Sequence, residues 1–138
     1  MLIRTVPPNV KSLFPKENLD FAESITEDEG KLLREVFNKH DSFEEIGEMI
    51  EAVWQQNPEL AGRMRKVLDG NIARLKGLSP EAVDYSKRIV AFVTHVMSSL
   101  SLGKDYCLET AERLHKEFQT LSQEDQEALR RANPDVHF

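Results

Sequence analysis

Hydrophobic residues recur at spacings of three and four positions along most of the chain, which is the pattern of amphipathic helices. Most of these stretches begin with a Ser, Thr or Asn followed by an acidic residue or a proline, an arrangement typical of helix N-termini. No stretch shows the sustained two-residue alternation of a strand. The pattern predicts an all-α fold of about six helices, at residues 26–40, 42–56, 58–76, 80–102, 105–121 and 122–132.

Two glycines bear on the length of the helix predicted at residues 58–76. Gly77 follows its last residue and predicts the stop. Gly70 lies inside the pattern, where a glycine costs about 1 kcal/mol relative to alanine. We therefore expect either a kink or a break at Gly70.

The helix predicted at residues 80–102 is apolar over a wider arc than the others. At 100° per residue its hydrophobic positions fill roughly 180° of the circumference, whereas a helix lying on a core surface needs a stripe of about 100°. This width predicts a central helix with the other helices packed around it. The residues left on its outward side are Asp84, Lys87, Arg88, His95 and Ser99.

Composition narrows the class of protein. The 138 residues fit one domain, spanning 1–138, with residues 1–14 as an N-terminal arm and 134–138 as a tail. Hydrophobic residues make up 40% of the chain, and its single cysteine excludes an internal disulfide. The net charge of −6 argues against nucleic acid as a partner. Because no stretch is typical of a secretory leader or a membrane span, we expect a cytoplasmic protein.

Motifs for catalysis or metal binding are missing from the sequence. There is no glycine-rich phosphate loop, nucleophile elbow or zinc-protease motif. Glu112 and His115 have the spacing of half a di-iron site, but the second such motif is absent. Cys107 lies on an apolar stripe without a neighbouring cation, which favours an inert buried thiol. We therefore expect a protein that is not an enzyme and that binds no cofactor or metal.

Three predicted helix caps also fit the pattern that acidic-directed kinases of the casein-kinase type recognise. Thr26, Ser42 and Ser122 each stand three positions before an acidic residue. Helix capping explains this spacing by itself, and phosphate at a helix N-terminus would also meet a favourable dipole. Both interpretations stay open, and Thr26 has the most acidic surroundings.

Charge is distributed unevenly along the chain. Residues 17–51 contain twelve acidic and three basic side chains, whereas residues 62–76 contain five basic and one acidic. Four of these basic residues border the apolar face of the predicted helix: Arg63 and Arg74 on one margin, Arg65 and Lys76 on the other. Long basic side chains commonly border a buried face. The alternative is a cationic rim that holds an anionic ligand headgroup or makes transient contact with an acidic membrane surface.

Four segments occur in an order that resembles a known family. They are PNVKSLFPKE at 8–17, ITEDEGKLLREV at 25–36, LSPEAV at 78–83 and LSQEDQEAL at 121–129. In this order and spacing the chain resembles the nematode fatty-acid- and retinol-binding (FAR) proteins from about residue 8 to residue 134. The resemblance implies a helical, non-enzymatic protein that carries fatty acids and retinol in an internal apolar cavity, with a casein-kinase-type site as a recurring feature.

A carrier of a long acyl chain needs an apolar cavity of several hundred Å³, on the order of ordinary ligand pockets. Flexible aliphatic and methionine side chains suit its lining. Ordinary core packing explains each candidate lining residue equally well, and a helical interaction module whose apolar groove accepts a partner helix is the alternative function. The candidates are Leu33, Phe37, Ile46, Ile50, Trp54, Leu68, Ile72, Ile89, Phe92, Val93, Val96 and Met97, with Arg63, Arg65, Arg74 and Lys76 as candidates for the headgroup.

Overall fold

The computed structural model of the chain describes residues 6–39, 46–98 and 104–138. Within these ranges every regular element is a helix, which confirms the predicted all-α fold. The helices are α1 (Pro8–Lys11), α2 (Lys16–Ser24), α3 (Glu27–Phe37), α4 (Ile46–Trp54), α5 (Pro58–Ala73), α6 (Pro80–Ser98), α7 (Lys104–Thr120) and α8 (Gln123–Ala132).

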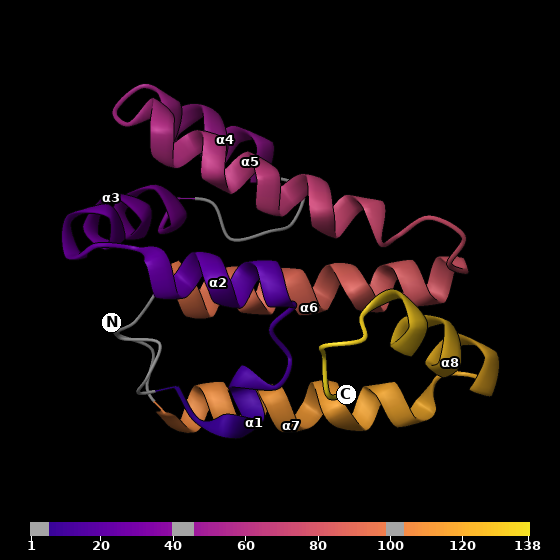
Figure 1. Cartoon of the computed structure of the whole chain (residues 1–138). Coiled ribbons are helices and arrows are strands. Elements are labelled where there is room, and N and C mark those ends of the chain that lie inside the picture. The colour runs from indigo at the N-terminus through magenta and orange to yellow at the C-terminus, as the bar shows by residue number, and fades with distance from the viewer. Residues whose placement is uncertain (1–5, 40–45, 99–103) are drawn as a thin grey trace.

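The helices are arranged around α6, which runs through the middle of the molecule (Figure 1). α4 and α5 form a helical hairpin on one side, where α4 also packs against α3 and α5 against α2. On the other side α6 packs against α7 and α8, and α1 packs against α7. The elements therefore form two layers that share α6.

Side-chain caps begin several helices, as the sequence predicts. Thr26 and Glu29 form a reciprocal capping box, in which each side chain accepts a hydrogen bond from the other residue's backbone N–H. The side chains of Asn57 and Ser122 cap α5 and α8. The predicted cap at Ser42 lies outside the described residues.

Helix α5 is shorter than predicted. The helix ends at Ala73. The Arg74 N–H donates the last helical hydrogen bond to the Gly70 carbonyl, and the chain turns after this residue. Gly77 has a φ of 80°, a left-handed conformation that glycine adopts without steric cost, so it still marks the change of direction. No break occurs at Gly70, since α5 continues through that residue.

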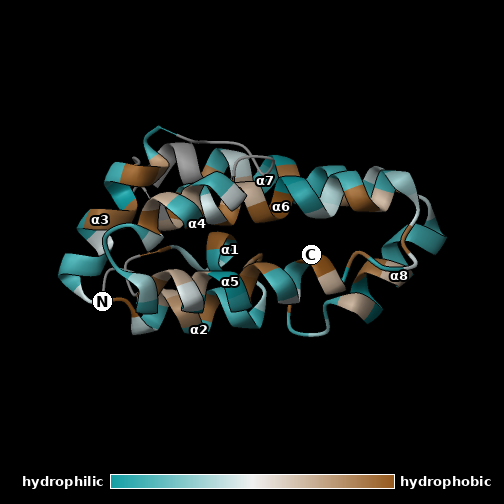
Figure 2. Ribbon diagram, turned by 90° about the horizontal axis from the view of Figure 1, so that it is seen from above, coloured by the Kyte–Doolittle hydropathy of each residue, from teal (hydrophilic) through white to brown (hydrophobic). Residues whose placement is uncertain are grey.

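Two clusters of buried side chains lie on opposite sides of α6. One includes Tyr85 of α6 and Phe118 of α7, together with buried residues of α1 and α8. The other includes Val90 of α6 and buried residues of α2, α3, α4 and α5, such as Leu33 and Met49. Hydrophobic positions face these interiors while hydrophilic positions cover much of the outside (Figure 2). Because α6 contributes to both clusters, the predicted central helix is confirmed.

Both ends of the described chain pack onto the cluster that contains Phe118. Leu13, in the segment predicted as an arm, is fully buried, and α1 lies within the same segment. At the other end, Phe138 stacks on Phe118 with ring centroids 4.6 Å apart. The His137 N–H donates to the Ser12 carbonyl at 2.9 Å, so the two ends are also joined to each other.

Candidate functional site

The cluster on the α4–α5 side of α6 contains a partly open cavity of about 40 Å³. Its wall is made by α2, α3, α4, α5 and α6, and every side chain in it is uncharged. Ten apolar side chains and three polar ones form the lining: Phe21, Phe37, Ile46, Met49, Ile50, Met64, Val67, Leu68, Val90 and Met97, with Asn18, Asn71 and Thr94.

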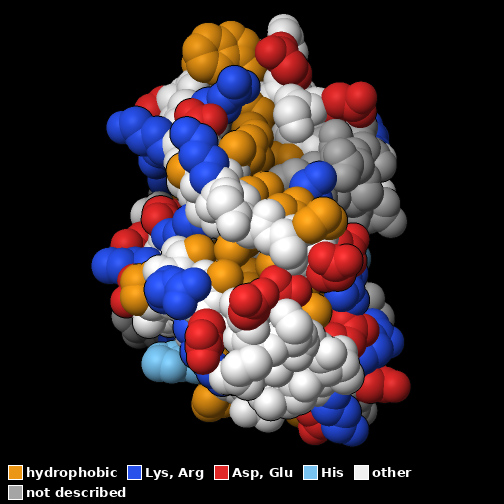
Figure 3. All heavy atoms as spheres, turned by 90° about the vertical axis from the view of Figure 1, so that its right-hand side faces the viewer, with side chains coloured by type: hydrophobic (Ala, Val, Ile, Leu, Met, Phe, Trp, Pro, Cys, Tyr) orange, Lys and Arg blue, Asp and Glu red, His pale blue; other side chains and the backbone are white. Residues whose placement is uncertain are grey.

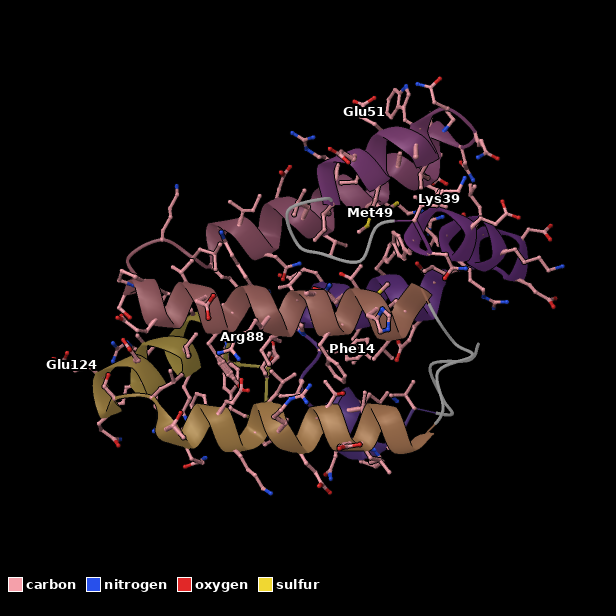
Figure 4. The ribbon with its side chains drawn as sticks, turned by 180° about the vertical axis from the view of Figure 1, so that it is seen from behind. Phe14, Lys39, Met49, Glu51, Arg88 and Glu124 are labelled. Atoms are coloured by element: carbon pink, nitrogen blue, oxygen red, sulfur yellow. The ribbon has the colours of Figure 1, made fainter. Side chains whose placement is uncertain are left out.

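Helical periodicity explains how α4 supplies one wall. Ile46, Met49 and Ile50 are spaced by three and four residues, so they share the face that looks inward. Figure 4 shows Met49 extending from α4 toward the interior, whereas Glu51 points away from it. Met49 is 1% exposed even though it borders the cavity. Three methionines line the space in all, and their flexible side chains can adapt to occupants of different shape.

A polar contact crosses the cavity wall between α2 and α5. The Asn71 Nδ2 group donates to the Asn18 Oδ1 atom at 3.0 Å and to the Val67 carbonyl at 2.9 Å. Both asparagines are buried, so these bonds offset part of the cost of placing amides in an apolar wall. The pair therefore fixes where α5 crosses α2.

Ion pairs connect α5 and its C-cap residue to α2 and to α3. Arg74 pairs with Glu17 of α2, and Arg63 pairs with Glu29 of α3. Arg63 also donates to the Ser24 hydroxyl at 3.1 Å. In the described part of the chain, the Nη1 atom of Arg74 is buried and has no hydrogen-bond partner. Two of the four headgroup candidates thus already attach α5 to its neighbours.

The other two headgroup candidates lie on the surface. Arg65 is exposed and its Nε atom lies 3.6 Å from Asp69 of the same helix, a pair that adds little stability in water. Lys76 is exposed beyond the end of α5. Figure 3, which views the end of the molecule formed by α5, α6 and α8, shows basic side chains beside an exposed apolar band. Of the four basic residues predicted as one rim, Arg63 and Arg74 therefore pair with carboxylates of neighbouring helices, whereas Arg65 and Lys76 are exposed.

A second and smaller cavity, of about 10 Å³, lies near the C-terminal segment. Its lining includes Asn71 and Val90, which also line the main cavity, and Ser86 and Asn133. A cavity of this volume holds about one water molecule. Asn71 thus stands in the wall between the two spaces.

The structure brings five of the twelve predicted lining residues to the main cavity: Phe37, Ile46, Ile50, Leu68 and Met97. Ile89 lines the second cavity. Leu33 is buried in the cluster that surrounds the main cavity, whereas Phe92, Val93 and Val96 are buried in the other cluster. Trp54 and Ile72 are 53% and 47% exposed and line neither cavity.

Sequence reasoning missed the contribution of α2 to the wall. Asn18 and Phe21 come from this helix, which the sequence pattern did not predict. Its N-cap is Pro15, which provides no side-chain hydrogen bond, so the usual polar start signal is lacking. Proline at that position was the available signal, because it ends the preceding element and is tolerated at a helix start.

The remaining sequence predictions concern phosphorylation, metal binding and membrane-spanning helices. Thr26 and Ser122 are exposed helix caps, and Ser42 lies outside the described residues. In residues 6–39, 46–98 and 104–138, no three His, Cys, Asp or Glu side chains are grouped so that they could hold a metal ion. No helix in these ranges combines the length and the apolar character needed to cross a membrane.

The fold and the cavity define the class: an all-α protein with an uncharged internal site between its helices. A family model described as "Nematode fatty acid retinoid binding protein (Gp-FAR-1)" matches residues 9–137. The chain therefore belongs to this family, which confirms the resemblance carried by its capped helices.

Relatives agree with this assignment. "Fatty-acid and retinol-binding protein 1" of Wuchereria bancrofti is 24% identical over 134 residues, covering 96% of this chain and 75% of that protein. The protein of the same name from Caenorhabditis elegans is 24% identical over 133 residues, covering 94% and 73%.

Two solved structures share the fold. The lipid binding protein Ce-FAR-7 from Caenorhabditis elegans is 49% identical with a TM-score of 0.84, covering 99% of this chain and 97% of that one. Na-FAR-1, a fatty acid and retinol binding protein from Necator americanus, is 20% identical with a TM-score of 0.80, covering 96% and 88%. At that identity the second likeness concerns the fold alone.

Proposed function

We propose that this protein is a non-enzymatic lipid carrier that reversibly binds fatty acids and retinol between α2, α4, α5 and α6. The observation that carries the proposal is the uncharged, mainly apolar lining of the main cavity. Family membership and the printed names of the relatives support the same ligand classes. Binding needs no covalent step, because apolar burial alone contributes roughly 25 cal/mol per Å² of surface removed from water.

The cavity must enlarge to hold such a ligand. Its volume of about 40 Å³ is well below the roughly 300–1,000 Å³ of small-molecule pockets. The α4–α5 hairpin closes one side of the cavity, and its contacts with α2 and α3 include the Arg74–Glu17 and Arg63–Glu29 pairs. We infer that ligand binding separates this hairpin from α2 and α6 while methionine side chains readjust.

The carboxylate of a fatty acid lies, in this proposal, at the basic rim of α5. Arg74 is the best placed of the four candidates, because its Nη1 atom is buried without a partner and can still donate. A charged donor strengthens a hydrogen bond to a carboxylate. Arg63, Arg65 and Lys76 add positive charge to the same helix and its end.

Titration with cis-parinaric acid, a fatty acid that fluoresces by itself, tests the proposal. We expect a saturable rise in its emission, reversed by oleate and by retinol. Circular dichroism should show that the protein is folded. A folded protein that gives no change in emission would contradict lipid binding.

Mass spectrometry of a solvent extract separates this function from the alternative of a helix-binding module. A carrier purified from cells should release lipid in amounts comparable to the protein. Absence of lipid in the extract, together with a specific protein partner that competes with cis-parinaric acid, would favour the interaction module instead.

A further inference from the structure

The amide pair of Asn18 and Asn71 has unused hydrogen-bonding capacity inside an apolar wall. The two residues are 3% and 5% exposed, and both line the main cavity. Buried polar groups are costly unless they are hydrogen-bonded, and nearly all of them in proteins have partners. Two asparagines at this position therefore need an explanation beyond holding α2 to α5.

The orientation of both amides follows from the bonds they make. The Val67 carbonyl can only accept, so the Asn71 Nδ2 group faces it, and the second Nδ2 hydrogen then faces the Asn18 Oδ1 atom. Among the described residues, the Asn18 Nδ2 group and the Asn71 Oδ1 atom make no further hydrogen bond, and neither atom is completely buried, so both remain accessible to a bound molecule. The pair thus retains one donor group and one acceptor.

A hydroxyl group complements this arrangement, because it donates once and also accepts. A carboxylate only accepts, so it could use the Asn18 donor but would face the lone pairs of the Asn71 oxygen. It would also be buried without a counter-ion, since no charged side chain lines the cavity. The polar group that this site matches is therefore an uncharged alcohol.

We propose that Asn18 and Asn71 bind the hydroxyl group of an uncharged lipid alcohol, such as retinol, inside the main cavity. The proposal rests on the lipid-binding function and adds a selection rule to it. Alcohol headgroups lie at the amide pair, while fatty-acid carboxylates lie at the basic rim around Arg74. Asn71 lies in the last turn of α5 and Arg74 is the C-cap residue of that helix, three positions later, so the two headgroup positions are neighbours.

The test compares three probes on the wild-type protein and on a variant with both Asn18→Leu and Asn71→Leu. Leucine has a similar volume, and removing both amides leaves neither of them without the other, while the Val67 carbonyl loses a side-chain donor. We expect the Kd of retinol to rise about tenfold, as the loss of two net hydrogen bonds implies. The Kd values of the retinol analogue that lacks the hydroxyl group, and of cis-parinaric acid, should stay within about twofold.

Asn38→Leu is the matched control, because Asn38 is exposed and lines neither cavity. It should leave the Kd of retinol within about twofold. Asn18→Leu alone serves as a second variant in which Asn71 keeps its bond to Val67, and it should raise the Kd of retinol about threefold. Circular dichroism and a thermal melt show which variants are folded.

The outcomes separate this proposal from the lipid-binding function. An unchanged Kd of retinol in the folded leucine variants, or equal weakening of all three probes, would overturn the hydroxyl site and leave lipid binding standing. An effect of Asn38→Leu as large as that of the changes at Asn18 and Asn71 would do the same. A wild-type protein that binds none of the three probes would overturn the function itself.

Discussion

Tyr85 combines burial, a hydrogen bond and ring packing at one position of α6. Its hydroxyl donates to the Leu114 carbonyl of α7 at 2.7 Å, and its ring meets Phe118 edge-on at 5.8 Å. Burial raises the pKa of Tyr85 above the usual value for tyrosine, and the nearby Glu117 carboxylate raises it further. The nearby Arg88 cation opposes the shift. Tyr85 is therefore held in its protonated form in the folded protein.

Tyr85→Phe should lower the free energy of unfolding by about 1 kcal/mol at pH 8, the usual net value of one hydrogen bond. Because the folded pKa is raised, the stability that protonation provides is present below the unfolded pKa of about 10 and lost above it. Between pH 8 and 11 the wild type should lose about 1.4 kcal/mol more than the variant. Urea unfolding at both pH values measures this. Equal pH dependence of the two proteins would contradict the raised pKa.

Substitutions of Arg74 and Glu17 should change the affinity for fatty acids more than the affinity for lipid alcohols. Arg74→Gln should raise the Kd of oleate about fivefold, since it removes a charged donor, and change that of retinol by less than about twofold. Glu17→Gln is the opposite change, because it frees Arg74 from its carboxylate partner. It should therefore lower the Kd of oleate. Competition with cis-parinaric acid measures both. Equal effects on oleate and retinol would exclude Arg74 as the carboxylate site.

At the scale of elements, α5 carries both the cavity wall and the bonds that attach it to the rest of the fold. Met64 and Leu68 face the cavity, whereas Arg63 and Arg74 reach α3 and α2. The helix also contains Gly62 and Gly70, which contribute no side chain to either role. Its stability can therefore be changed without touching the lining.

Gly62→Ala and Gly70→Ala should each raise the free energy of unfolding by about 0.5–1 kcal/mol, because glycine is a poor residue inside a helix. A Cβ at Gly62 would have no neighbour within 4 Å, and one at Gly70 would lie 3.6 Å from the Glu17 Oε1 atom, an ordinary contact. Gly77→Ala is the control and should destabilise by about 1 kcal/mol, because its φ is +80°. Thermal or urea unfolding gives the three values, and destabilisation by Gly62→Ala would contradict the account of α5.

Local signals explain why most elements could be predicted and α2 could not. The capping box at Thr26 and Glu29 and the cap at Asn57 act within a few residues, so sequence alone identifies them. α2 has nine residues and no side-chain cap, and its inward face includes Asn18, which breaks the apolar pattern. Its helical state depends on packing against α5, which is not visible in the sequence of α2.

Tertiary packing likewise determines which apolar residues reach the cavity. Trp54 is the last residue of α4, and Ile72 lies near the end of α5, where the described helices leave its side chain about half exposed. Helical periodicity places Trp54 and Ile72 on apolar stripes. It does not show where the neighbouring helix ends, and so it does not predict that these two side chains are exposed. The same limit applies to Phe92, which periodicity assigns to the apolar arc of α6 without saying which of the two clusters it joins.

At the scale of the whole molecule, α6 separates two clusters with different roles. The cluster around Tyr85 and Phe118 is packed with aromatic rings and closed by the segment around Ser12 and by the C-terminal residues. The cluster around Met49 contains the main cavity and three methionines. We therefore expect the first cluster to stay in place during ligand binding and the second to expand.

The most direct test of this account follows the methionine methyl groups by NMR in protein labelled with ¹³C at those methyls. Met49, Met64 and Met97 line the cavity, and Met→Leu substitutions assign their signals. On titration with oleate, all three signals should shift and saturate together. Oleate binding that leaves these three signals unchanged would place the ligand elsewhere and contradict binding in the main cavity.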